Sequence, residues 1–192
     1  LETPENDADI LAKTLRKTGS EVTVTKNQTK AQILASIAQA TNSLNEDDAF
    51  ILYLSGHGLQ LGGKNYFAPI GVSFLEKKNL RMMTLILDCS RPNSFNHADP
   101  STHLLLRIPG LSLGGKTVLT QSGLAKMTAK DGQMFVMAAK PGEFVAPEPR
   151  PGKNSHFATA LTASLQKNLD IRHAVTIAGK TVDTWSEGAQ HP

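Results

Sequence analysis

The chain has 192 residues, of which 40% are hydrophobic and 19% are charged, values that are ordinary for one soluble globular domain. Its net charge of +3 is too small to argue for a nucleic-acid partner, and no basic stripe with interleaved aromatic residues is present. No apolar stretch approaches the length of a membrane span, so no membrane partner is expected. The single cysteine excludes an internal disulfide framework, which favours a reducing, cytoplasmic location.

Hydrophobic periodicity predicts alternating helices and strands. Helices are expected over residues 4–15, 28–44, 157–165 and 174–182. Strands are expected over residues 21–25, 50–54, 65–70, 83–87 and 133–139. Three stretches rich in glycine, proline or serine are interpreted as a turn and two loops, over residues 58–63, 92–132 and 141–155. This alternation predicts a layered α/β sheet.

Two apolar runs end at residues that can carry chemistry. Phe50–Leu54 is followed by Ser55–Gly58, which includes His57, and Met83–Leu87 is followed by Asp88–Arg91. Because the carboxyl ends of neighbouring parallel strands meet at one edge of a sheet, we expect the histidine beside the second polar segment. A base beside a nucleophile is the minimum apparatus of covalent catalysis. A lone histidine is more often structural, but its position between glycines at a strand end favours catalysis here.

The second polar segment contains two alternative nucleophiles. Cys89 would be a good nucleophile near a histidine, because imidazolium lowers the pKa of a thiol, although a cysteine of this kind is more often a small core residue. Ser90 would need stronger activation by its base. Asp88, at a buried strand end, requires a cationic partner, either Arg91 or a basic side chain of a substrate.

A phosphate-loop pattern, G-x-x-x-x-G-K-[ST], is matched by Gly110–Thr117. Such a loop requires a strand before it and a helix after it, so that backbone amides and the helix dipole hold the phosphates. The residues after Lys116 are β-prone and soon reach a glycine. Nucleotide binding is therefore the weakest of the functional hypotheses.

An ordered set of segments carries a resemblance over nearly the whole chain. The segments are Pro4–Ala8, Tyr53–Gly58 with Gly63–Tyr66 and Pro69, Ile86–Arg91 with Phe95, Gly123–Lys126, Ala138–Glu143, Asn154–Phe157 with Ala160 and Leu161, and Gln190–Pro192. Together they resemble the caspase-like cysteine peptidases, and most closely the bacterial metacaspase-like branch, the orthocaspases. No single segment is decisive, but their order is specific.

The resemblance implies a catalytic role for the two strand ends. His57 would be the general base, and the family's nucleophilic cysteine would fall two positions after the aspartate, where this chain has Ser90. Cys89 stands one place earlier, and a shift of one residue turns a side chain to the other face of a strand. Ser90 is therefore predicted as the nucleophile position, in a nearly inert chain, with Cys89 as the alternative. The backbone amides of Gly58 and Ser90 would form the oxyanion hole.

The resemblance also implies the substrate. An acidic pocket would bind the Arg or Lys before the scissile bond of a peptide or protein, because a guanidinium pairs with carboxylates in a bidentate manner. Asp7 and Asp88 match its two carboxylates, and Glu143 is a further candidate. The candidate self-cleavage sites are Arg107, Lys116, Lys126 and Lys130.

The implied fold is a caspase-like three-layer α/β sandwich, with a mostly parallel central sheet between helices on both faces. Residues 1–192 would form one peptidase domain, with a large-subunit-like part over about 1–95, a loop over about 96–122 and a small-subunit-like part over about 123–192. The reaction would require no metal or other cofactor, with calcium as a candidate activator. An alternative function is a pseudo-protease that only binds protein partners.

Two features depart from the family pattern. The chain starts after the position of the family's first central strand, and His57 and Cys89 are 32 residues apart, against roughly 50 quoted for the equivalent caspase residues. We therefore expect these residues to be an incomplete copy of a longer polypeptide.

Overall fold

A computed structural model of the chain describes residues 2–45, 47–61, 64–67, 70–71, 82–89, 120–121, 123–146, 153–167 and 170–192. Its helices are α1 (Glu2–Lys17), α2 (Lys30–Asn42), α3 (His156–Leu165) and α4 (Ile171–Trp185). Its strands are β1 (Ala49–Ser55), β2 (Gly58–Leu61), β3 (Lys64–Phe67), β4 (Ile70–Gly71), β5 (Met82–Asp88), β6 (Thr120–Gln121) and β7 (Gln133–Met137).

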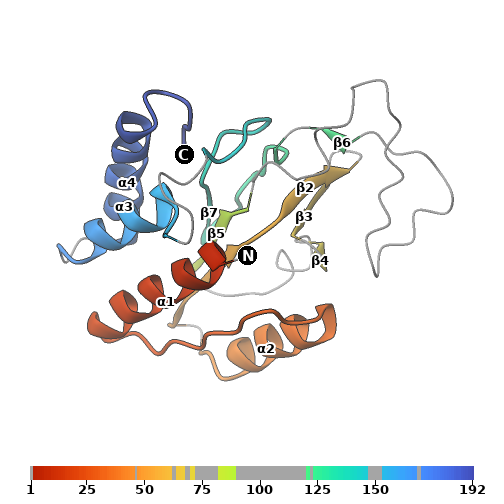
Figure 1. Cartoon of the computed structure of the whole chain (residues 1–192). Coiled ribbons are helices and arrows are strands. Elements are labelled where there is room, and N and C mark those ends of the chain that lie inside the picture. Colours follow the sequence, from red (N-terminus) through yellow and green to blue (C-terminus); the bar gives the residue numbers. More distant parts are fainter. Residues whose placement is uncertain are drawn as a thin grey trace, which may run out of the picture.

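The centre of the fold is a parallel sheet in which β5 lies between β1 and β7 (Figure 1). β1 pairs with β5 along its whole length, up to the pair Ser55–Asp88, and β5 pairs with β7 up to Leu87–Met137. The carboxyl ends of these strands therefore share one edge of the sheet. From Met83 onward β5 is buried, which explains why its sequence is an unbroken apolar run.

Helices cover both faces of this sheet. Alternate side chains of a strand point to opposite faces, so Ile86 packs in a core with Leu11 of α1 and Phe157 of α3, to which α4 also contributes. Leu85 and its neighbours on the opposite face pack in a second core with Ile37 of α2. The predicted three-layer architecture with a mostly parallel central sheet is confirmed.

A small antiparallel sheet, in the order β4-β3-β2-β6, adjoins the end of β1 (Figure 1). Its hairpin pairs Gly58–Leu61 with Lys64–Phe67, so the turn predicted over 58–63 is wrong for residues 58–61. Glycine at position 58 is typical of a turn, but here residues 58–61 pair with Lys64–Phe67 across the hairpin. The strand predicted over 65–70 is divided, because β3 ends at Phe67 and β4 begins at Ile70.

The strand predicted over residues 21–25 is also wrong, because residues 20–26 form no strand. Alternating valines are not sufficient for a strand, which also needs a partner, and none of the described strands pairs with this segment. Instead it is attached to α1, where the Arg16 guanidinium donates to the Val22 carbonyl at 2.9 Å and Lys26 pairs with Asp9 at 2.7 Å.

The four predicted helices are confirmed, with differences at their ends. Thr29 caps α2, with its side chain accepting from the Gln32 amide. α4 is longer than the predicted 174–182, because Asp170 caps it by accepting hydrogen bonds from the first-turn amides.

The loop predicted over 92–132 is described only in part. Thr120–Gln121 pairs with β2, and residues 123–132 form neither helix nor strand. The other residues of this loop lie outside the described residues.

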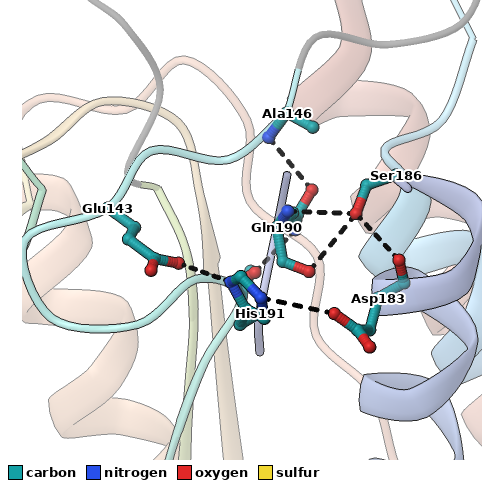
Figure 2. A network of polar contacts seen from close by, with 7 residues as sticks. Glu143, Ala146, Asp183, Ser186, Gln190 and His191 are labelled. Atoms are coloured by element: carbon teal, nitrogen blue, oxygen red, sulfur yellow. Dashed lines mark hydrogen bonds and ion pairs between the residues drawn. The ribbon is translucent and has the colours of Figure 1, made fainter. Parts of the chain in front are cut away.

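The C-terminal segment folds back onto the loop after β7 (Figure 2). The Gln190 side chain is fully buried, donates to the Ala138 carbonyl at 2.6 Å and accepts from the Ala146 amide at 3.0 Å. Because a buried amide needs partners for its polar atoms, these bonds fix residues 138–146 against the end of the chain.

Candidate active site

The ends of β1 and β5 are joined by backbone hydrogen bonds on either side of His57. The Gly56 amide donates to the Asp88 carbonyl at 3.3 Å, and the Gly58 amide donates to the Cys89 carbonyl. The structure therefore brings His57 to the same sheet edge as Asp88 and Cys89, as the sequence predicts. Ser90, the predicted nucleophile position, lies outside the described residues.

Both glycines beside His57 are required by local geometry. Gly56 has φ of +153°, and a Cβ there would lie 3.1 Å from the Phe67 ring. A Cβ on Gly58 would lie 2.5 Å from the Cys89 carbonyl oxygen and 2.7 Å from its Sγ. The small residues thus allow the histidine segment to approach the end of β5 closely. For the Gly58 amide to bind an oxyanion, its bond to Cys89 would have to open.

Cys89 belongs to the core on the α2 side of the sheet. It is 1% exposed and packs in the cluster that contains Leu87 and Leu124. Cysteines buried in an apolar core are generally unreactive. This location favours a core role for Cys89 over its alternative role as nucleophile.

Asp88 and Asp7 form a buried acidic pair on the opposite face, which α1 and α3 cover; we call it the acid pair. Both are 0% exposed. Asp88 Oδ2 accepts from the Tyr53 hydroxyl at 2.9 Å and the Ser155 hydroxyl at 2.6 Å. Asp7 Oδ1 accepts from the Ser155 amide at 2.8 Å and the Asn154 side chain at 3.1 Å. One residue, Ser155, therefore contacts both carboxylates.

The acid pair places two carboxylates in one buried region. All the donors named above are neutral, and two buried carboxylates repel each other unless a cation or a proton compensates them. Asp88 Oδ1 is buried and has no hydrogen-bond partner among the described residues. Burial raises the pKa of Tyr53 well above its usual value, and the charges of Asp88 and Asp7 raise it further. Tyr53 is therefore a neutral donor at ordinary pH.

Glu143, the third predicted pocket carboxylate, lies in a different network. Its Oε2 is 3.0 Å from His191 Nδ1, and Asp183 lies 3.4 Å from the other ring nitrogen of His191. Figure 2 shows the Glu143 side chain directed at His191. In this structure Glu143 thus helps to fasten the C-terminal segment, while its proposed contact with substrate stays a prediction.

The predicted self-cleavage sites fall partly in the described chain. Lys126 and Lys130 are exposed. The backbone beside Lys126 is held by Asn65, whose side chain donates to the Ala125 carbonyl at 2.8 Å and accepts from the Ala125 amide at 2.6 Å. Arg107 and Lys116, like the phosphate-loop pattern over 110–117 and Arg91, lie outside the described residues.

Sequence reasoning missed two residues that hold the acid pair. Tyr53 lies within an apolar run, which by itself indicates only a buried strand, although its spacing of two from Ser55 puts both on one strand face. Ser155 lies two residues before the helix predicted over 157–165, close to where serine commonly caps a helix. That signal predicts a cap but not a contact with two distant aspartates.

Comparison with known protein families agrees with this geometry. A family model described as "Caspase domain" matches residues 1–192. The chain therefore belongs to the caspase domain family, whose members are cysteine peptidases. A comparison with curated proteins found no match. Among the described residues, no helix is long and apolar enough to cross a membrane, and no three His, Cys, Asp or Glu side chains gather as metal ligands.

The close approach at Gly58 can be tested by Gly58→Ala. The added methyl would collide with the Cys89 backbone and Sγ, so we expect the variant to lose about 1–3 kcal/mol of unfolding free energy, measured by urea denaturation. Gly179→Ala is the matched control, because a Cβ there meets nothing closer than 3.8 Å and lies inside α4. The Gly179→Ala variant should gain about 0.5–1 kcal/mol of unfolding free energy, because alanine favours a helix interior over glycine. Equal stabilities for the two variants would contradict the described strand-end geometry.

Proposed function

We propose that this chain is the peptidase domain of a metacaspase-like endopeptidase that cleaves after Arg or Lys, with serine at the nucleophile position. The observation that carries the proposal is the buried acid pair, Asp7 and Asp88. Asp88 ends β5 at the same sheet edge that carries His57. A buried pair of carboxylates is suited to a guanidinium, which can donate two parallel hydrogen bonds to one carboxylate.

The proposed reaction is acyl transfer. His57 removes the proton of the nucleophile at position 90, whose sulfur or oxygen attacks the scissile carbonyl carbon. The tetrahedral intermediate collapses by releasing the amine, which takes the proton back from His57. Water, deprotonated by His57, then attacks the carbonyl carbon of the acyl-enzyme. The new carboxyl end is released, and the nucleophile takes the proton back from His57. No metal or other cofactor enters these steps, and calcium stays a candidate activator.

The serine at position 90 sets the expected rate. A hydroxyl has a far higher pKa than a thiol, so a histidine arranged for a thiol activates it poorly. We therefore expect the present chain to bind basic peptides and to cleave them very slowly. The same serine is what favours the second candidate function, a pseudo-protease that uses the groove only to bind protein partners.

A restored nucleophile tests the proposal. Ser90→Cys should cleave fluorogenic peptides that end in Arg or Lys, at least tenfold faster than a matched peptide that ends in Asp, and assays with and without calcium would show whether it activates. Ser90→Ala is the control and should show no turnover. If Ser90→Cys folds but cleaves none of these peptides, with or without calcium, the pseudo-protease function is supported instead. Mass spectrometry of the same sample would show any cleavage after Arg107, Lys116, Lys126 or Lys130.

The acid pair can be tested separately in the Ser90→Cys chain. Asp88→Asn should lower kcat/KM for an Arg-ended peptide by roughly 30-fold or more, because removing one partner of a buried charge pair costs about 2–5 kcal/mol. Asp9→Asn is the matched control, since Asp9 lies on the same helix as Asp7 but is exposed and paired with Lys26; exposed pairs contribute little. Equal kcat/KM values for the two variants would contradict the proposed pocket.

A further inference from the structure

Ser155 is the residue through which the two carboxylates of the acid pair are joined. Its backbone amide donates to Asp7 Oδ1 at 2.8 Å, and its hydroxyl donates to Asp88 Oδ2 at 2.6 Å. It is 1% exposed, so water cannot easily replace either bond. Asp7 and Asp88 come from segments 81 residues apart in the sequence, and Ser155 sets their relative position from a third segment.

The same hydroxyl also caps α3. Its oxygen accepts a hydrogen bond from the Ala158 amide at 3.0 Å. A hydroxyl can donate one hydrogen bond and accept others through its lone pairs, so Ser155 donates to Asp88 while its oxygen accepts from the Ala158 amide. Such chains of hydrogen bonds strengthen one another. The partial positive charge at the start of α3 therefore acts on Asp88 through Ser155.

The bonds to Asp88 also fix which of its oxygens is available. Tyr53 and Ser155 both donate to Oδ2, whereas Oδ1 is buried and has no partner among the residues that the structure describes. Two donors on one oxygen hold the carboxylate plane in one orientation. Oδ1 is therefore the oxygen with acceptor capacity left for an incoming cation.

We propose that Ser155 is a positioning residue for substrate specificity, which orients Asp88 and spaces it from Asp7 so that the pocket accepts a basic side chain. This inference rests on the proposed function and goes beyond it by assigning a role to a residue that touches neither the reacting atoms nor the substrate. Ser155 is expected to affect how tightly a basic substrate binds, with little effect on the chemical step.

The test separates this role from helix capping. Ser155→Gly removes the hydroxyl while keeping a residue that is tolerated at an N-cap, at a cost of only a few tenths of a kcal/mol. Thr29→Gly makes the equivalent change at the cap of α2, away from the acid pair. Ser155→Thr is the conservative variant, because threonine also carries a hydroxyl on Cβ. Each change is made in the Ser90→Cys chain, and circular dichroism establishes that each variant is folded.

The expected result is a split between KM and kcat. For an Arg-ended peptide, Ser155→Gly should raise KM about tenfold, because a hydrogen bond to a charged group is lost, and should leave kcat within about twofold. The inhibition constant of benzamidine, a small amidine cation, should rise by the same factor. Ser155→Thr should restore both values, and Thr29→Gly should leave both unchanged.

Four outcomes would overturn the inference. An unchanged KM and benzamidine constant in Ser155→Gly would show that Ser155 is only a helix cap. Equal effects of Ser155→Gly and Thr29→Gly would lead to the same conclusion. A loss confined to kcat would show that Ser155 acts on the chemical step and not on substrate binding. If the Ser90→Cys parent itself showed no preference for Arg and no inhibition by benzamidine, the proposed function would fail first, and the inference with it.

Discussion

The pairing of β1 with β5 is the interaction on which the rest of the structure depends. It aligns Ser55 with Asp88 and thereby places His57 at the edge where β5 ends. β5 lies in the middle of the parallel sheet and is buried on both faces, so its end is held firmly. A histidine on the following segment can then be positioned by backbone hydrogen bonds from Gly56 and Gly58 on either side of it.

Because consecutive side chains at the end of β5 point to opposite faces of the sheet, Asp88 and Cys89 lie in different layers. Asp88 faces α1 and α3, where Ser155 donates to both Asp88 and Asp7, and Cys89 faces the apolar core beside α2. The carboxylate side is polar and fully buried, and its described donors from Tyr53, Asn154 and Ser155 are neutral. The fold thus places two buried carboxylates next to the histidine segment, and buried ionisable groups of this kind are candidates for a functional site.

Much of this arrangement could be predicted from the sequence, because apolar runs and helical periodicity reflect burial directly. The runs ending at Ser55 and Asp88 predicted adjacent parallel strands, and the order of motifs predicted the family. What failed had non-local causes. Residues 21–25 alternate like a strand but have no described partner, and Gly58 begins a strand rather than a turn. Ser155 combines a cap with a long-range contact, and only the cap leaves a local signal.

A crystal structure of the Ser90→Cys chain with an arginine-ended peptide aldehyde would test the central claim most directly. The account predicts a covalent bond from Sγ of residue 90 to the aldehyde carbon, with His57 within hydrogen-bond distance of that centre. It also predicts the arginine guanidinium on Asp88 Oδ1. An aldehyde bound to Cys89, or a guanidinium placed away from both Asp7 and Asp88, would contradict it.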